Sequence, residues 1–166
     1  QSGHNKSYHF FGGGVRDLKI ALGSDHGGYS LKEVIKKFLD EKAIAYEDLG
    51  TYSTESTDYP QFAEKVAKAV VSGVCERGIL CCGTGIGISI AANKVPGIRC
   101  AAVSEPYSAL MSREHNNANV LALGARVVGE GLALQIVEVW LNAEFVGGRH
   151  ANRVNLISEI EKKYCK

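Results

Sequence analysis

The chain has 166 residues, 45% of them hydrophobic, which is enough for one buried core and too few for two ordinary domains. Its net charge of +1 excludes a general electrostatic attraction to nucleic acid or to an anionic membrane, so a bound anion must be held by local groups. Because the sequence shows neither an apolar run near the roughly 20 residues of a membrane span nor a signal-peptide pattern, we expect a soluble, cytoplasmic protein.

Residues 1–16 differ in character from the rest of the chain. They have no apolar period and include three consecutive glycines near their end. We expect a flexible extension or a remnant of recombinant expression, in which His4 and His9 have no chemical role. The functional domain is predicted to span residues 17–166.

From Leu18 onward, apolar runs of strand length alternate with segments of helical period. The predicted strands are 19–22, 45–49, 78–82, 99–103 and 120–123. The predicted helices are 29–41, 60–72, 87–94, 106–113, 130–141 and 152–164. This alternation is typical of βα units with helices on both faces of a parallel sheet. The sequence therefore predicts a single doubly wound, Rossmann-like α/β domain with a five-stranded parallel sheet.

The first predicted helix has a clear apolar face. That face carries Leu31, Val34, Ile35, Phe38 and Leu39, at the spacing of one side of a helix. We expect it to pack on the sheet. The charged residues fall opposite and are expected to point away from the core; they are Lys32, Glu33, Lys36 and Lys37.

Five cysteines are present, an odd number, without the paired C-x-x-C spacing of a zinc site. Reduced thiols in a cytosol fit this pattern best. Cys75, Cys100 and Cys165 are expected to be packing or surface residues. Cys81 and Cys82 are neighbours in a predicted strand, so their side chains point to opposite faces of the sheet, and Cys81 is expected to be a packing residue.

Two polar, glycine-rich turns follow the first and third predicted strands. They are residues 23–28 (GSDHGG) and residues 82–87 (CGTGIG). In an open parallel sheet, ligands bind beyond the carboxyl ends of the strands, so both turns are expected at one edge. In the first turn, Asp25 either contacts a ligand or caps the next helix. His26 either contacts a ligand or is an ordinary loop residue.

The second turn offers backbone N–H groups and a helix N-terminus to an anion. A thiol there is favoured as its thiolate, so Cys82 is either a base or nucleophile, or a buried structural cysteine. The spacing does not fit a nucleotide loop or a dinucleotide fingerprint. A phosphatase loop would need arginine where Ile88 stands. The anion is therefore expected to be smaller than a nucleotide.

Polar residues late in the chain provide two further candidates. His115 follows the fourth predicted helix, where it is either a C-terminal cap or a functional group. Arg149 and Arg153 lie one helical turn apart at a predicted helix start, and two guanidinium groups suit a phosphate.

Taken together, these segments resemble the B-type ribose-5-phosphate isomerases. The resemblance rests on residues 23–28, 58–60 (DYP), 82–87, 113–116 (REHN) and 148–150 (GRH) with the later Arg153, and it covers residues 18–163. It implies interconversion of ribose 5-phosphate and ribulose 5-phosphate through a cis-enediol, in the pentose phosphate pathway, with no metal and no organic cofactor.

The resemblance also implies roles for individual residues. Cys82 would move the proton between C2 and C1, and the loop with Thr84 would stabilise the developing oxyanion. Asp25 and His115 would bind and open the furanose ring. The implied phosphate contacts are His26, Arg126, Arg149 and Arg153. The other implied substrate contacts are Tyr59, Gly83, Gly85, Ile86, Gly87 and Asn116. Some relatives replace the cysteine by a glutamate in the next helix; Ile88 or Ser89 stands there in this chain, which is thus of the cysteine type.

Family members form homodimers or tetramers whose active sites combine two subunits, with the segment holding His115 and Asn116 supplied by the partner. The resemblance implies the same here. Three alternatives remain open from the sequence: an isomerase of a six-carbon sugar phosphate such as allose 6-phosphate or galactose 6-phosphate, a non-catalytic sugar-phosphate sensor, and a flavin- or nucleotide-binding module of similar fold. Retention of Asp25, Cys82 and His115 favours the pentose enzyme.

Overall fold

The computed structural model describes residues 18–165. The predictions made for residues 1–16, including those for His4 and His9, lie outside the described residues. Within residues 18–165, none of the helices is both long and apolar enough to cross a membrane.

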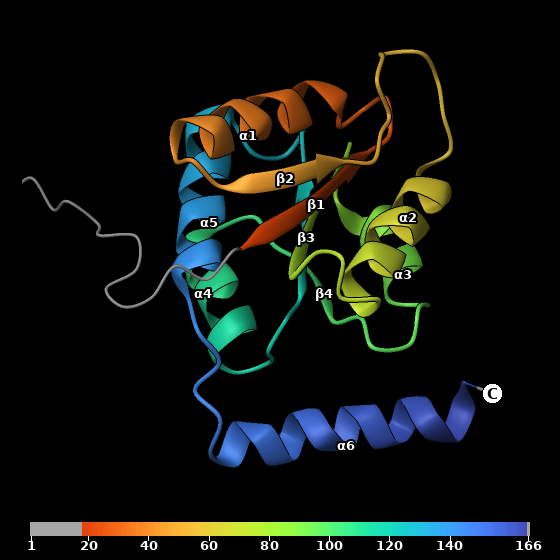
Figure 1. Ribbon diagram of the computed structural model, residues 1–166, viewed down its shortest axis with the longest axis vertical. Coiled ribbons are helices and arrows are strands. Elements are labelled where there is room, and N and C mark those ends of the chain that lie inside the picture. The colour runs from red at the N-terminus through yellow and green to blue at the C-terminus, as the bar shows by residue number, and fades with distance from the viewer. Residues whose placement is uncertain (1–17, 166) are drawn as a thin grey trace, which may run out of the picture.

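The observed elements alternate as the sequence predicts (Figure 1). The strands are β1 (Lys19–Ser24), β2 (Ala45–Asp48), β3 (Arg77–Cys82), β4 (Cys100–Ala102) and β5 (Val120–Gly124). The helices are α1 (Tyr29–Glu41), α2 (Tyr59–Val71), α3 (Ile86–Ala92), α4 (Pro106–Glu114), α5 (Glu130–Asn142) and α6 (Arg149–Tyr164). Every predicted boundary lies within two residues of the observed one except the start of α6, which begins three residues early because His150 and Ala151 donate backbone N–H groups to Gly147 and Gly148.

All strand pairs are parallel, and the sheet order is β2-β1-β3-β5-β4. After β1 the chain moves to one side of the sheet, and after β3 it moves to the other. The crevice between the carboxyl ends of β1 and β3 is therefore the switch point at which open α/β sheets bind ligands. The two glycine-rich turns predicted as functional follow these two strands.

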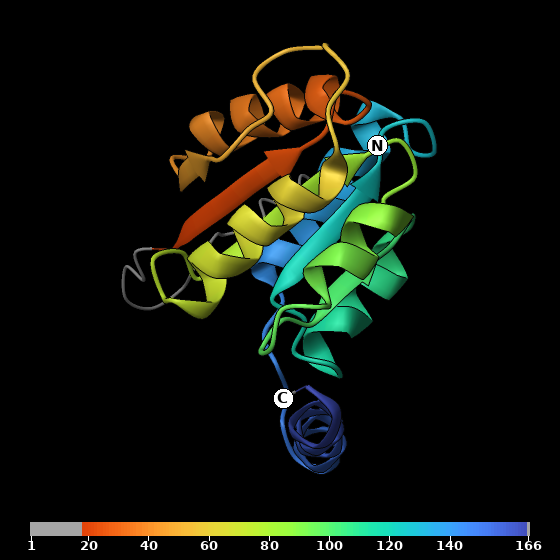
Figure 2. The same ribbon diagram turned by 90° about the vertical axis from the view of Figure 1, so that its right-hand side faces the viewer.

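Helices cover both faces of the sheet, which confirms the doubly wound fold (Figure 2). One core lies between the sheet and α1, α4 and α5, with Trp140 fully buried in it. The other core lies between the sheet and α2 and α3. Cys81 belongs to the first core and Cys82 to the second, as the alternation of a strand requires.

The prediction for α1 was right for most of its apolar face and wrong for one lysine. Leu31, Ile35, Phe38 and Leu39 are buried, and Val34 is half-buried. Lys32 was expected to point away from the core, yet only 1% of it is exposed. The reason is that the connection between β2 and α2 folds over this side of α1 and covers the ammonium group.

The last helix, α6, lies apart from the α/β body in both views (Figures 1 and 2). Val154 is its one buried residue among those described. Leu156, Ile157 and Ile160 are all about half exposed. A helix that shows this much apolar surface is typical of a contact surface for another chain.

Candidate functional site

Cys82 ends β3 at the switch point, and its thiol is held by the turn that follows. The Gly85 N–H donates a hydrogen bond to Cys82 Sγ, with 3.1 Å between nitrogen and sulfur. Gly85 has a φ of +79°, a left-handed conformation that favours glycine and that turns its N–H toward the thiol. An amide donor at this distance stabilises a thiolate, so the geometry suits a base. Burial raises the pKa of the neighbouring Cys81 thiol, which keeps that group protonated.

The turn after β1 is packed directly against the thiol turn. The Asp25 N–H donates to Cys81 O at 3.3 Å. A methyl group on Gly28 would lie 2.2 Å from the same carbonyl oxygen, so only glycine allows this approach. Asp25 Oδ1 accepts the Gly28 N–H at 3.0 Å, which closes the turn but does not make Asp25 the helix N-cap, since that position is Gly28 itself.

The Asp25 carboxylate and the thiol turn meet beside Gly27. A methyl group there would lie 3.4 Å from Asp25 Oδ1 and 3.4 Å from the Gly83 nitrogen. Arg126, which follows β5, reaches the same place: its N–H donates to Gly83 O at 3.0 Å, and its Nη2 would lie 3.7 Å from that methyl group. A carboxylate, a guanidinium and backbone amides thus converge on one small region.

His26 faces the connection between β2 and α2. The Thr57 N–H donates to His26 Nδ1 at 3.1 Å, so the proton of the neutral ring is on Nε2. Tyr59 begins α2, and its ring covers the first turn of α3, where a methyl group on Gly87 would lie 2.7 Å from Tyr59 Cζ. Tyr59 therefore borders the thiol turn from the side of α2, and His26 is held by the connection that leads into α2.

Thr84 and Ile86 complete this turn at the surface, where both are exposed. Thr84 Oγ1 accepts the Ile86 N–H at 3.2 Å. The structure therefore brings together one group of predicted residues at the carboxyl edge of the sheet. They are Asp25, His26, Tyr59, Cys82, Gly83, Thr84, Gly85, Ile86, Gly87 and Arg126.

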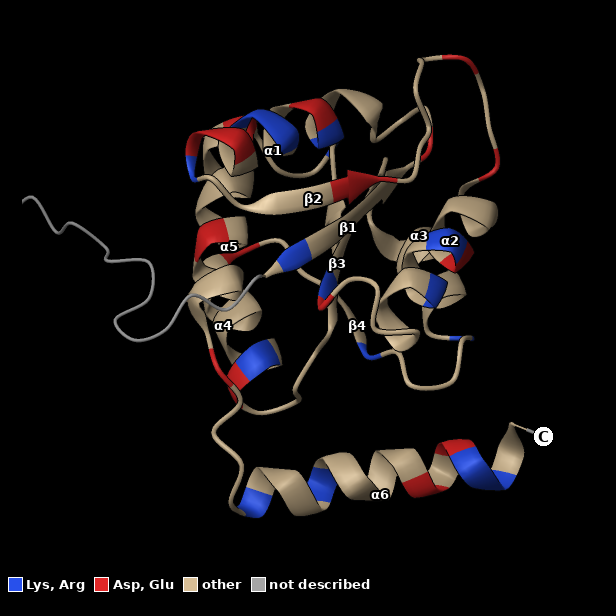
Figure 3. Ribbon diagram, viewed as in Figure 1, with Lys and Arg blue, Asp and Glu red and all other residues tan. Residues whose placement is uncertain are grey.

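The remaining predicted residues form a second group around the start of α6. The imidazole rings of His115 and His150 stack with their centroids 4.0 Å apart and an interplanar angle of 7°. Burial lowers the pKa of His150, and the positive charges of His115, Arg149 and Arg153 lower it further. The first turns of α6 carry basic residues, as Figure 3 shows; Arg149 and Arg153 are exposed, and His115 and His150 are half-buried.

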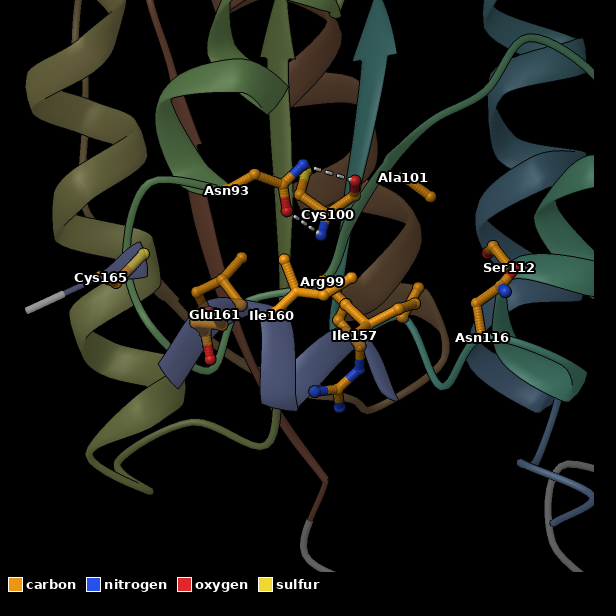
Figure 4. A pocket seen from close by; sticks show the side chains of 12 residues that line it. Asn93, Arg99, Cys100, Ala101, Ser112, Asn116, Ile157, Ile160, Glu161 and Cys165 are labelled. Atoms are coloured by element: carbon orange, nitrogen blue, oxygen red, sulfur yellow. Dashed lines mark hydrogen bonds between the residues drawn. The ribbon is translucent and has the colours of Figure 1, made fainter. Parts of the chain in front are cut away.

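Asn116 also belongs to this group and lines a pocket of about 480 Å³ between α6 and the start of β4. Ile157 and Ile160 enter it from α6, opposite Cys100 at the start of β4 (Figure 4). Burial raises the pKa of Cys100 to about 12, consistent with its expected role as a packing residue.

The two groups lie at opposite ends of the strands of the sheet. Helix α4 leaves the carboxyl end of β4 and runs back for nine residues, or about 13 Å at 1.5 Å per residue. His115 therefore lies toward the amino ends of the strands, whereas Cys82 lies at a carboxyl end. Within one chain, the structure does not bring His115, Asn116, Arg149 or Arg153 to Cys82.

The contacts of some supporting residues could not be predicted from the sequence. Thr57 lies in a polar connection without periodicity, so nothing indicated that its N–H would orient His26. Arg113 is buried and donates to Ala118 O at 2.6 Å and to Asn117 Oδ1 at 3.1 Å, which fixes the segment after α4. Burial lowers the pKa of Arg113 to about 10. A charged residue at the end of an amphipathic helix gives no sequence signal of this kind.

A family model described as Ribose/Galactose Isomerase matches residues 20–157, which include both groups of residues. The chain belongs to the ribose/galactose isomerase family. This confirms the resemblance found in the sequence. No cluster of three His, Cys, Asp or Glu side chains able to hold a metal ion occurs among residues 18–165.

Individual members of the ribose/galactose isomerase family are similar over nearly their whole length. Ribose-5-phosphate isomerase B of Escherichia coli K12 is 55% identical, covering 87% of this chain and 97% of the relative. The structure of ribose-5-phosphate isomerase B from Clostridium thermocellum is 64% identical with a TM-score of 0.88, covering 89% of this chain and 99% of that one. The enzyme of the same name from Mycoplasma genitalium, solved with bound ribulose-5-phosphate, is 42% identical with a TM-score of 0.84, covering 88% and 97%.

Proposed function

We propose that this protein is a ribose-5-phosphate isomerase that interconverts ribose 5-phosphate and ribulose 5-phosphate. The observation that carries the proposal is the Cys82 thiol at the switch point, hydrogen-bonded by the Gly85 N–H and bordered by Asp25. Family membership and a 55% identical ribose-5-phosphate isomerase B support the choice of substrate. So does the 42% identical enzyme with bound ribulose-5-phosphate.

The reaction requires one base and a place for negative charge. The Cys82 thiolate takes the proton from C2 of the open-chain aldose, the C1–C2 double bond forms, and the electrons of the carbonyl bond move to O1. O1 then takes up a proton and O2 gives up its hydroxyl proton, the thiol returns the first proton to C1, and O2 becomes the new carbonyl oxygen, so the step balances without an added oxidant or reductant. The Thr84 hydroxyl and the other backbone N–H groups of the loop 83–87 stabilise the charge on oxygen, while the Gly85 N–H stays with Cys82 Sγ and the Ile86 N–H with Thr84 Oγ1.

The site is completed by a second subunit in a homodimer. The observations that support this assembly are the separation of His115 from Cys82 within one chain and the exposed apolar side chains of α6. Asp25 from one subunit and His115 from the other open the furanose ring, and Asn116 contacts the sugar. His115 stacks on His150, so Arg149 and Arg153 enter the site from the same subunit as His115.

The phosphate is bound by His26 and Arg126 of one subunit and by Arg149 and Arg153 of the other. Arg153→Ala is expected to raise KM for ribose 5-phosphate about tenfold or more while kcat changes little, because a phosphate contact binds substrate and transition state alike. Steady-state kinetics measure both constants. A large fall in kcat at unchanged KM would contradict this role.

The substrate is tested by comparing kcat/KM for ribose 5-phosphate, allose 6-phosphate and galactose 6-phosphate on the purified protein. Ribose 5-phosphate is expected to give the highest value. A higher value for a six-carbon substrate would replace the pentose assignment, and no turnover with any of them would favour a sugar-phosphate sensor. We place the enzyme in the cytoplasm, because a phosphorylated sugar is an intracellular metabolite and the Cys82 thiol must stay reduced.

A further inference from the structure

Among residues 18–165, Lys32 is the most deeply buried charged side chain, and its ammonium makes two hydrogen bonds. Lys32 Nζ donates to Asp48 Oδ1 at 2.5 Å and to Thr51 O at 2.5 Å. The same nitrogen lies 5.6 Å from the ring centroid of Tyr29 and 5.2 Å from that of Tyr52. The group is thus held by β2 and by the connection that follows it.

A charge in this position is not explained by packing alone. Lys32 lies beside Leu31 on a helix that already buries several apolar residues. Burying its ammonium costs free energy because the charge loses its hydration, and an apolar side chain at this position would avoid that cost. What an apolar side chain could not provide is a donor to Thr51 O. The ammonium therefore specifies the position of the connection rather than the stability of the core.

The connection between β2 and α2, residues 49–58, carries groups that border the thiol turn. Next to Lys32 it is attached to the end of β1: the Thr51 N–H donates to Ser24 O and the Ser24 N–H to Gly50 O, each at 2.7 Å. Farther along, most of its side chains are exposed. It then reaches Thr57, whose N–H orients His26, and leads into Tyr59.

We propose that Lys32 is a positioning residue for the sugar phosphate: by fixing residues 49–58 at Thr51, it holds the Thr57 N–H against His26. This inference rests on the proposed function, in which His26 contacts the phosphate. Lys32 touches no substrate. It acts through the connection and so sets the affinity of the site.

Lys36 provides a matched control, because it binds the same carboxylate without reaching the connection. Lys36 Nζ lies 2.9 Å from Asp48 Oδ2, and its other bond is to Glu33 on the same helix. Burial alone would raise the pKa of Asp48, but hydrogen bonds from Lys32, the Gly50 N–H and Lys36 lower it below the usual value. Asp48 is therefore an anion shared by the two lysines, and only Lys32 extends from it to Thr51.

The first test compares Lys32→Met with Lys36→Met. Lys32→Met is expected to raise KM for ribose 5-phosphate about tenfold with kcat within about twofold, since small misplacement of a binding group is costly. Lys36→Met is expected to keep both constants near those of the wild type. A purely structural role for Lys32 would lower the concentration of active enzyme and hence the apparent kcat, with KM unchanged, and that result would overturn the proposal.

The second test asks whether Lys32 acts through His26. In a His26→Ala background, Lys32→Met is expected to change KM by less than about twofold, because coupled residues are not additive. A full tenfold effect in that background would show that Lys32 acts elsewhere.

A third measurement does not depend on activity. Hydrogen exchange of the amides of residues 51–59 is expected to be faster in Lys32→Met than in the wild type, and unchanged in Lys36→Met. If the wild type showed no turnover but exchange were faster in Lys32→Met, the proposed function would be wrong, while the role of Lys32 in fixing residues 49–58 would stand. Unchanged exchange in Lys32→Met would contradict that role. Should Lys32→Met fail to fold, Asp48→Asn is measured in its place. Exchange of residues 51–59 is then expected to be faster than in the wild type, by less than in Lys32→Met. Unchanged exchange in Asp48→Asn would count against the proposal.

Discussion

Replacing Cys82 by alanine is expected to lower kcat by on the order of a thousandfold, because a positioned general base contributes about 10²–10⁴ to the rate. The neighbouring thiol cannot replace it, because Cys81 lies in the core on the opposite face of the sheet. The resemblance implies that a base could instead stand in the following helix, but Ile88 and Ser89 are there and neither side chain is ionisable near neutral pH. The loss should therefore appear in kcat, with KM changed less, because the phosphate contacts and the backbone donors remain.

The neighbouring thiol is a control that the chain itself provides. Cys81 lies one residue earlier on the same strand, in the opposite core, and burial raises the pKa of its thiol. Cys81→Ala is expected to lower the melting temperature through the cavity it leaves, while kcat stays near the wild-type value. Near-full activity of Cys82→Ala, or an equal loss in both variants, would exclude the thiol of Cys82 as the base.

The fold was predictable because a doubly wound sheet repeats one simple pattern. Buried parallel strands such as β3 and β5 are short continuous apolar runs, and the helices between them show a clear apolar period. Lys32 is an exception, because the helical period predicted an exposed side chain and the structure shows a buried one. The angular position of a residue on a helix predicts which side faces the sheet, but not which connecting segment covers the other side.

The carboxyl-edge half of the candidate site was also predictable from the sequence. The switch-point rule places the turns after β1 and β3 together whatever their residues are, and the glycines then indicate close approach. The position of His115 could not be predicted in this way, because the switch-point rule covers the turns that follow strands, whereas His115 follows a helix. That part rests on the family resemblance, and the structure adds that Arg149 and Arg153 lie with His115 rather than with Cys82.

Activity should return when two inactive variants share one dimer. Cys82→Ala and His115→Ala homodimers are each expected to lose at least about a hundredfold in activity, since each lacks an acid–base group. A heterodimer has two sites, of which one combines both substitutions and the other neither. By this symmetry it should have about half of the wild-type activity.

The heterodimer is isolated by co-expressing the two variants with different affinity tags and purifying over both. Its rate with ribose 5-phosphate is compared with those of the two homodimers at equal protein concentration. A heterodimer of two Cys82→Ala subunits, one for each tag, controls for any effect of the tags. If the doubly tagged Cys82→Ala/His115→Ala dimer were as inactive as that control, His115 and Cys82 would have to act within one subunit. The roughly 13 Å course of α4 away from the carboxyl edge of the sheet argues against that arrangement.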